Sequence, residues 1–420
     1  MTTVRILLTT TCLLFLCVAH SKAQDQPATI GERLLATPAI KSAVDATRRN
    51  EPAILDEQVR LCEIEAPPFK EQKRAAALKA VFEGLGLKNV RIDTAGNVLG
   101  ERPGAAPRPH LVFSAHLDTV FPEGTNVNTT RMGAVLNGPG IADDCRGLAV
   151  LVGVIRAMNE AAIQTPGSIT FVGTVGEEGL GDLRGVKHLF ERDLKGRIDR
   201  FVSVDGSGMG ITHTAVGSRR YRVTYKGPGG HSYGAFGLAN PIHALGRAIA
   251  KISELRVPTE PKTTFNVGRI GGGTSVNSIP FEAWLELDLR SADKAALTAL
   301  DAAALRAFEQ ALAEENERWG QRGQLTLDCR LVGDRPAGQM PSSAPIIAAA
   351  VSVTKALGLT ATLDEGSTDS NVPINLGIPA VTIDGGGSSR GTHSLDEEFD
   401  TTNSWQGTAR ALLLAIALTY

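Results

Sequence analysis

The sequence contains little cysteine. Five cysteines occur in 420 residues, and two of them, Cys12 and Cys17, lie near the N-terminus. The other three, Cys62, Cys145 and Cys329, are far apart in the chain. So few and so widely spaced cysteines exclude a small fold held together by several disulfides. One disulfide could form among the last three, and at least one thiol would then stay free or pair outside the chain.

The sequence also lacks an excess of charge of either sign. Its formal net charge is −2, and acidic and basic residues are mixed without long runs of one sign. A protein that binds nucleic acid through its charge usually carries a basic run or patch, so we expect no nucleic-acid partner. The length is sufficient for two domains, and the apolar fraction of 42% is ordinary for a globular protein.

A largely apolar stretch at the N-terminus is too short to span a membrane. It covers residues 6–19, follows Arg5, and precedes the small-x-small triplet Ser21-Lys22-Ala23. This pattern predicts a signal peptide at residues 1–23, cleaved before Gln24, and a secreted or periplasmic protein without stable membrane insertion. An uncleaved membrane anchor is the alternative.

Predicted strands alternate with predicted helices over most of the chain. The strands are short apolar runs at residues 110–115, 168–175, 200–204 and 380–383. The predicted helices lie at residues 70–85, 148–158, 344–357 and 408–418. This alternation predicts an α/β domain in which helices cover a mixed, mostly parallel sheet.

The pattern changes in the middle of the chain. Residues 219–226 alternate between apolar and polar side chains, as a half-exposed strand does. From there to residue 332 the predicted order is strand, helix, strand, strand, helix, strand, which is that of a ferredoxin-like unit. We therefore predict a catalytic domain made of residues 24–216 and 335–420, with an inserted α+β lid or dimerisation domain at residues 217–334.

Histidine and acidic residues follow the predicted strands of the catalytic domain. His116, the pair Glu177 and Glu178, and Asp205 each come directly after a strand, and His393 follows another strand after a longer loop. In open α/β sheets, ligands bind at the carboxyl ends of the strands. Each motif alone is a common surface pattern, but their shared position predicts one site.

Two imidazoles and several carboxylates are suitable ligands for zinc or a similar divalent ion. Asp143, on a turn-rich loop before a helix, is the best candidate to bridge two ions that together would activate a water and polarise a carbonyl. A simple helix N-cap is its alternative role. Because Glu177 and Glu178 are adjacent and point in different directions, one could bind metal while the other accepts the proton of the water.

Asp118 lies two residues after His116, and residues two apart on an extended chain point to the same side. We expect its carboxylate to hold one ring nitrogen of His116 while the other nitrogen faces a metal ion.

These residues occur in a longer series of motifs. In chain order the motifs are Ser-Ala-His116-Leu-Asp118, Gly-Ile-Ala-Asp143-Asp144, Gly-Glu177-Glu178-Gly, Val-Asp205-Gly, Gly-Gly-His231-Ser, Gly-Thr-Ser-Val-Asn277-Ser-Ile-Pro280, Asp-Leu-Arg290, Ser-Thr-Asp369-Ser-Asn371 and Thr-His393-Ser. From about residue 66 to the C-terminus the chain thereby resembles the dinuclear-zinc peptidases and amidohydrolases that include carboxypeptidase G2, peptidase T and aminoacylase-1.

The resemblance implies a dinuclear zinc site with five ligands. His116 and Asp205 would hold one ion, Glu178 and His393 the other, and Asp143 would bridge them. The cofactor would be two Zn²⁺ per chain, with Co²⁺ or Mn²⁺ as substitutes.

The resemblance also implies roles for residues outside the metal site. Glu177 would be the general base, and Asp118 would orient His116. His231 would stabilise the oxyanion, either within its own chain or, as in some relatives, in the partner chain of a homodimer formed through the inserted domain. Asn277 and Arg290 would bind the backbone or carboxylate of the substrate.

The chain departs from the family pattern at one position of the bridging loop. Similar sequences often have Asp-Asp-Lys-Gly-Gly where this chain has Asp143-Asp144-Cys145-Arg146-Gly147. A role of that lysine therefore cannot be transferred. We expect Cys145 to be a packed, inert thiol rather than a metal ligand.

The predicted function is that of a zinc-dependent metallopeptidase acting on small peptides. The alternatives within this chemistry are an N-acyl amino acid amidohydrolase and a glutamate-releasing carboxypeptidase. An alternative of another class is a non-catalytic binding protein with the same fold.

Overall fold

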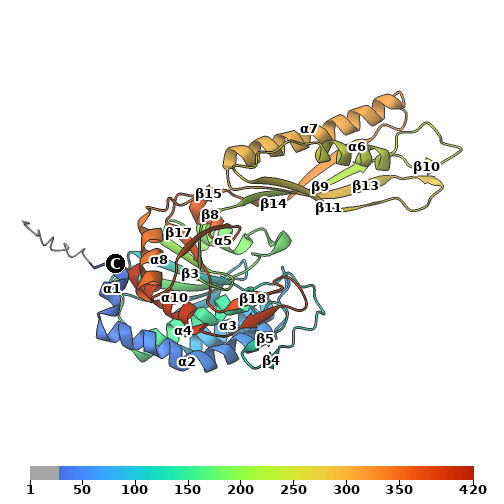
Figure 1. Ribbon diagram of the computed structural model, residues 1–420. Helices are drawn as coiled ribbons and strands as arrows, with labels where there is room; N and C mark the ends of the chain where they lie inside the picture. Colours follow the sequence, from blue (N-terminus) through green and yellow to red (C-terminus); the bar gives the residue numbers. More distant parts are fainter. Residues whose placement is uncertain (1–27) are drawn as a thin grey trace, which may run out of the picture.

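The computed structural model describes residues 28–420, which form two parts (Figure 1). The predicted signal peptide at residues 1–23 lies outside this range. The larger part contains a sheet with helices around it, and the smaller part extends from its upper side as a layer of strands beneath two helices. Within residues 28–420, no helix combines the length and the apolar character that crossing a membrane requires.

The larger part is built on a nine-stranded mixed sheet. Its path is β1-β2-β6-β3-β7-β17-β8-β15, with β16 paired to β8. The strands are β1 (Lys88–Ile92), β2 (Val98–Arg102), β3 (His110–His116), β6 (Ser168–Thr174), β7 (Arg200–Val204), β8 (Gly210–Ala215), β15 (Gly338–Gln339), β16 (Thr362–Gly366) and β17 (Ala380–Ile383). The central strands β6, β3, β7 and β17 are parallel. The predicted α/β class with a mostly parallel central sheet is therefore confirmed.

Helices cover both faces of this sheet, so its central strands are buried along nearly their whole length. Phe113 of β3 packs into the larger core, whereas the next residue toward the N-terminus, Val112, packs into a second core on the opposite face. The helices of the larger part are α1 (Ile30–Leu35), α2 (Pro38–Cys62), α3 (Gln72–Gly84), α4 (Cys145–Glu160), α5 (Arg184–His188), α8 (Pro345–Ala356), α9 (Asn371–Asn375) and α10 (Trp405–Ala417). Helices α2, α4 and α10 pack against one another.

A small antiparallel sheet stands beside the main sheet and was not predicted from the sequence. Its order is β18 (Ser388–Arg390), β19 (Glu398–Asp400), β5 (Val135–Asn137) and β4 (Thr130–Met132). Strands of three residues are too short to produce a recognisable hydrophobic period. The pairing of β19 with β5 places the loop that contains His393 next to the loop that contains Asp143.

The inserted part has the ferredoxin-like order of elements. It runs through β9 (Gly217–Lys226), α6 (Pro241–Ser253), β11 (Thr263–Gly272), β13 (Glu282–Ser291), α7 (Lys294–Arg318) and β14 (Thr326–Arg335). Its antiparallel sheet has the order β11-β13-β9-β14, and α6 and α7 lie on one face (Figure 1). Strand β14 ends at Arg335, one residue beyond the predicted boundary.

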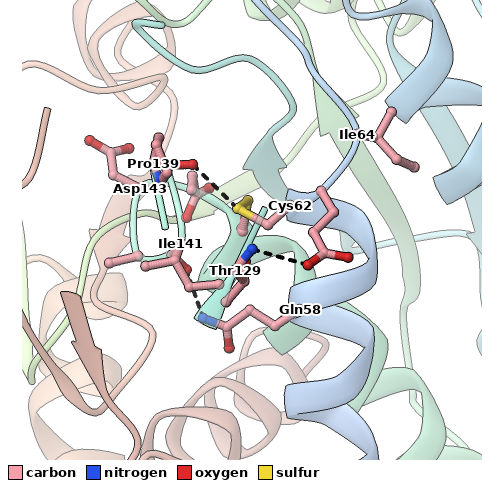
Figure 2. The surroundings of a disulfide bond; sticks show 12 residues. Gln58, Cys62, Ile64, Thr129, Pro139, Ile141 and Asp143 are labelled. Atoms are coloured by element: carbon pink, nitrogen blue, oxygen red, sulfur yellow. Dashed lines mark hydrogen bonds between the residues drawn. A yellow bond between two sulfur atoms is a disulfide. The ribbon is translucent and has the colours of Figure 1, made fainter. Parts of the chain in front are cut away.

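A disulfide joins the end of α2 to the start of α4. It links Cys62 and Cys145, whose Cα atoms are 5.5 Å apart, and Figure 2 shows it beside the loop of Pro139 and Ile141. The expectation that Cys145 is an inert thiol is therefore wrong. The sequence left this pairing open because the partners are 83 residues apart and meet only when α2 packs against α4. Cys329 is a free, partly buried cysteine.

We predict that the disulfide contributes several kcal/mol to stability. The double variant Cys62→Ala/Cys145→Ala should lose roughly 4 kcal/mol of unfolding free energy, because a cross-link over a long loop restricts the unfolded chain. Denaturant unfolding measures this loss, and Cys329→Ala serves as the matched control. An unchanged midpoint for the double variant would contradict the prediction.

Candidate active site

The main sheet brings three of the predicted site positions together at one edge. His116 is the last residue of β3, Glu177 and Glu178 follow β6, and Asp205 follows β7. Because these strands are parallel neighbours, their carboxyl ends meet. The small sheet adds Asp143 and His393 from outside, so residues from five separate segments converge.

Asp143 lies between two imidazoles. Its Oδ1 is 3.0 Å from Nε2 of His116, and its Oδ2 is 2.9 Å from Nε2 of His393. Asp205 approaches His116 at 3.9 Å, and Glu178 approaches His393 at 3.1 Å. Two clusters of ligand atoms therefore share Asp143, and in each of them the atoms lie within 4.8 Å of one another.

The electrostatics of the cluster favour positive charge between the carboxylates. Burial alone would lower the pKa of His116, but the carboxylates of Asp144, Asp143 and Asp205 raise that pKa well above its usual value. Hydrogen bonds to Asp143 and Glu178 raise the pKa of His393 to about 10. Both rings thus bind protons strongly at positions where a metal ion would replace them.

Asp118 holds the site in a different way from the one expected. Nδ1 of His116 donates to the main-chain carbonyl of Asp118 at 2.9 Å, whereas the Asp118 carboxylate is 3.8 Å away. The carboxylate accepts hydrogen bonds from the amides of Glu177 and Glu178, at 3.0 and 2.8 Å. Asp118 therefore links the His116 strand to the loop of the two glutamates. The periodicity of the strand could not reveal this because the chain turns directly after His116.

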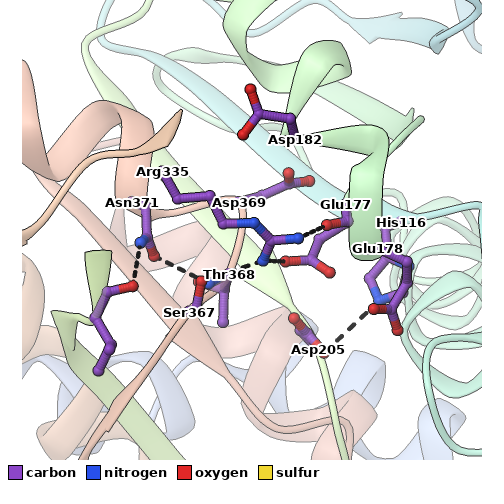
Figure 3. Close-up of polar contacts among 12 residues, drawn as sticks. His116, Glu177, Glu178, Asp182, Asp205, Arg335, Ser367, Thr368, Asp369 and Asn371 are labelled. Carbon is purple, nitrogen blue, oxygen red and sulfur yellow. Dashed lines mark hydrogen bonds and ion pairs between the residues drawn. The ribbon is translucent and has the colours of Figure 1, made fainter. Parts of the chain in front are cut away.

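Arg335 was not singled out from the sequence, although it contacts the proposed base. It comes from the last position of β14, is buried, and its Nη1 lies 2.9 Å from Oε1 of Glu177 (Figure 3). It also donates to the main-chain carbonyl of Glu177 and to Oγ of Ser367. Burial raises the pKa of Glu177, and the charge of Arg335 opposes that rise. Nothing in the sequence signalled this contact, because a single arginine at the end of a strand does not indicate that its side chain reaches a residue of the other domain.

A second buried acid, Asp369, lies next to this pair (Figure 3). Its Oδ2 accepts a hydrogen bond from Thr174 at 2.5 Å. Burial, and then the nearby charge of Glu177, raises its pKa to about 7.

A pocket of about 250 Å³ lies at this junction of the two parts. Asp143, Glu177 and His393 contribute to its walls, and the inserted part contributes three arginines, namely Arg220, Arg290 and Arg335. Arg290 is thus located at the pocket, as a substrate-binding role requires. Arg220 and Arg290 both pair with Asp288, at 2.9 and 2.7 Å.

His231 and Asn277 are not brought to this pocket within the chain. They lie at the end of the inserted part, where Figure 1 labels β10 (Gly230–His231). Strand β10 pairs with β12 (Ser278–Ile279), and Asn277 directly precedes β12. Both residues are exposed. The ring of His231 accepts hydrogen bonds from the amides of Tyr233 and Gly234, each at 3.2 Å.

Comparison with known proteins identifies the family. Residues 112–417 match the model of peptidase family M20/M25/M40, which is well over half of the chain. The chain belongs to this family. It is therefore an enzyme of a metal-dependent hydrolase family, and the resemblance predicted from the motifs is confirmed.

Curated relatives carry different names. The chain is 27% identical over 352 residues to the uncharacterized protein YqjE of Bacillus subtilis, with 80% of this chain and 90% of the relative covered. It is 27% identical over 262 residues to carboxypeptidase G2 of Pseudomonas sp., which covers 59% of this chain and 62% of the relative. A succinyl-diaminopimelate desuccinylase of Aromatoleum aromaticum is 30% identical over 216 residues, or 46% of this chain and 55% of the relative.

Solved structures share the fold over most of the chain. A tripeptidase from Staphylococcus aureus has a TM-score of 0.72 at 24% identity, and the match covers 88% of this chain and 98% of that one. The aminopeptidase PepT of Bacillus cereus has a TM-score of 0.67 at 22% identity, with the same coverage. At these identities the likeness concerns the fold and not the substrate.

We predict that Asp118→Asn disturbs the glutamate loop. The side-chain amide can accept one of the two N–H groups but presents its own donor to the other, which should cost about 1–3 kcal/mol of unfolding free energy. Denaturant unfolding measures the loss. The exposed Asp328→Asn in the inserted part controls for the change of charge, and equal stability of the two variants would contradict the role of Asp118.

Proposed function

We propose that the protein is a dinuclear-zinc peptidase that hydrolyses amide bonds of small peptides. The observation that carries this proposal is the Asp143 carboxylate, which directs one oxygen to each of two histidines. Each histidine has a further carboxylate beside it, so the chain offers two half-sites that share a bridge. This arrangement suits a pair of divalent ions. A helix N-cap, the alternative role of Asp143, would not require two histidines at its carboxylate.

The donor set fits zinc, since each half-site combines one imidazole nitrogen with carboxylate oxygens. His116 and Asp205 would hold one ion, Glu178 and His393 the other, with Asp143 shared; Co²⁺ or Mn²⁺ could substitute. When bound, the two ions would polarise the scissile carbonyl and lower the pKa of a water molecule.

Glu177 is the proposed general base. Its carboxylate borders the pocket and the candidate metal ligands, and this carboxylate would receive the proton of the attacking water and pass it to the leaving amine. Arg335 holds this carboxylate in place from the inserted part, while Asp118 fixes the main chain of the same loop. The base is thereby oriented from both domains.

The pocket favours a small substrate with a carboxylate. A volume of about 250 Å³ accommodates a short peptide or an acyl amino acid rather than a folded protein. Arg290, half-exposed beside Arg220, is the proposed partner of a substrate carboxylate. The names carboxypeptidase G2 and succinyl-diaminopimelate desuccinylase make N-acyl amino acid hydrolysis or glutamate release the second candidate function.

A homodimer would give His231 and Asn277 a role. Both lie at the end of the inserted part, away from the pocket of their own chain. We propose that the inserted part pairs with a second copy, so that His231 donates to the oxyanion and Asn277 binds substrate there. Export from the cytoplasm is a further proposal, supported by the N-terminal sequence and by the Cys62–Cys145 disulfide, which is typical of oxidising compartments.

The first test counts metal ions. Freshly purified, unchelated protein should contain two divalent ions per chain by elemental analysis, because two half-sites share Asp143. Chelation should remove both ions together with activity, and zinc should restore both. A content near zero after zinc addition would refute the dinuclear site.

The second test separates the two adjacent glutamates. Glu177→Gln should keep both ions and lose most turnover, because the amide cannot accept the proton, whereas Glu178→Gln should lose metal. Turnover is measured on a panel of dipeptides, tripeptides and N-acyl amino acids, which also decides between the two candidate functions. No turnover of any panel member by the metal-loaded wild type would favour a binding protein.

A further inference from the structure

Glu397 is a buried carboxylate that the proposed chemistry does not use. It lies in the loop between β18 and β19, four residues after His393, and it is fully buried. Its Oε1 accepts hydrogen bonds from the amides of Ala142 and Asp143, at 2.8 and 3.1 Å. Its Oε2 accepts from the amide of Gly140 at 3.1 Å. Three amides of the bridging loop, residues 138–143, therefore point at one side chain.

The main chain of Glu397 holds the other end of the same loop. Its carbonyl accepts hydrogen bonds from the amide of Gly138, at 3.0 Å, and from the side chain of Asn137, at 3.2 Å. Across residues 28–420, no lysine, arginine or histidine forms an ion pair with the Glu397 carboxylate. Its charge is thus stabilised by the loop amides, which makes the loop conformation and the buried carboxylate depend on each other.

Other contacts hold the bridging loop from the opposite side. Gln58 donates to the carbonyl of Ile141 at 2.7 Å, and the disulfide fixes Cys145 to α2 (Figure 2). These contacts attach the loop to α2. Glu397 differs from them because it attaches the loop to the segment that contains His393, the residue that faces Oδ2 of Asp143.

We propose that Glu397 is a positioning residue that sets the bridging Asp143 against His393 and so allows both ions to bind at once. This inference rests on the proposed dinuclear site. His393 is half-exposed and lies on a loop, so its place relative to Asp143 depends on the contacts between the two loops. Loss of the Glu397 contacts would leave the half-site of His116 and Asp205 on the strand ends. The half-site of Glu178 and His393 would lose its alignment.

The test is a metal titration of Glu397→Gln. The side-chain amide can replace only one of the two carboxylate oxygens as an acceptor, so its NH₂ group would meet an amide donor of the loop. Metal-free protein is titrated with Co²⁺ and followed by its visible absorption spectrum. The variant should bind one ion with nearly wild-type affinity and the second roughly 10–100-fold more weakly, the usual loss when a hydrogen-bond partner of a metal ligand is removed.

Glu398→Gln is the matched control. Glu398 is the next residue, is partly exposed, and pairs with Arg390 on the surface at 2.7 Å. The Glu398→Gln variant should bind two Co²⁺ ions with wild-type affinity and give the wild-type absorption spectrum. Circular dichroism establishes that both variants are folded. If Glu397→Gln does not fold, Glu397→Asp, which keeps the charge but shortens the reach, is judged by the same criterion.

The outcomes separate this inference from the proposed function. A wild type that binds fewer than two Co²⁺ ions would refute the dinuclear site itself. A wild type and a folded Glu397 variant that both bind two ions with equal affinity would refute the positioning role alone. Selective weakening of the second ion in the Glu397 variant, with the Glu398 control unchanged, supports it.

Discussion

The contact of the Asp143 carboxylate with two imidazoles is the interaction on which the organisation of the site depends. The two histidines come from parts of the chain 277 residues apart, one at the end of a central strand and one on a loop of the small sheet. Asp143 is within 3.0 Å of both rings, and it lies on a short loop between β5 and α4. The fold holds that loop on two sides, through Gln58 and the disulfide on α2 and through Glu397 near the second histidine.

The site concentrates acidic side chains in the protein interior. Asp118, Asp144, Asp205 and Asp369 lie with the two glutamates within a small region, and burial raises the pKa of each of these four aspartates. Buried carboxylates that lack compensation cost several kcal/mol each, so a chain keeps them together only where it gains something in return. Backbone amides stabilise the buried charge of Asp118, and bound cations would stabilise the charges of the carboxylates that face the pocket. This distribution is typical of a functional site.

The inserted part affects the site through its arginines. Arg220 and Arg335 lie on β9 and β14, the strands that connect it to the catalytic domain, and Arg290 lies on the neighbouring β13, so its base forms one wall of the pocket. Its far end carries His231 and Asn277. One end of the inserted part therefore lines the pocket, whereas the other end lies away from the pocket of its own chain. The order of the motifs along the chain does not reveal which residues line the pocket, because it does not tell whether two motifs meet within one chain.

The α/β class and the ferredoxin-like insert follow from the sequence, because hydrophobic periodicity sets the order of elements. The convergence of His116, Glu178 and Asp205 also follows from it, because parallel strands bring their ends to one edge. Asp143 and His393 were included through the family motifs, and the small sheet that places them was not predicted. Only the tertiary structure decided four contacts. They are the Cys62–Cys145 disulfide, the hydrogen bonds of the Asp118 carboxylate to the Glu177 and Glu178 amides instead of to His116, the contact of Arg335 with Glu177, and the hydrogen bonds of Glu397 to the bridging loop. Each of these contacts joins segments that no local pattern relates. Hydrogen bonds and ion pairs depend on distances of about 3 Å, and such distances are set by the packing of whole elements rather than by the period of any one of them.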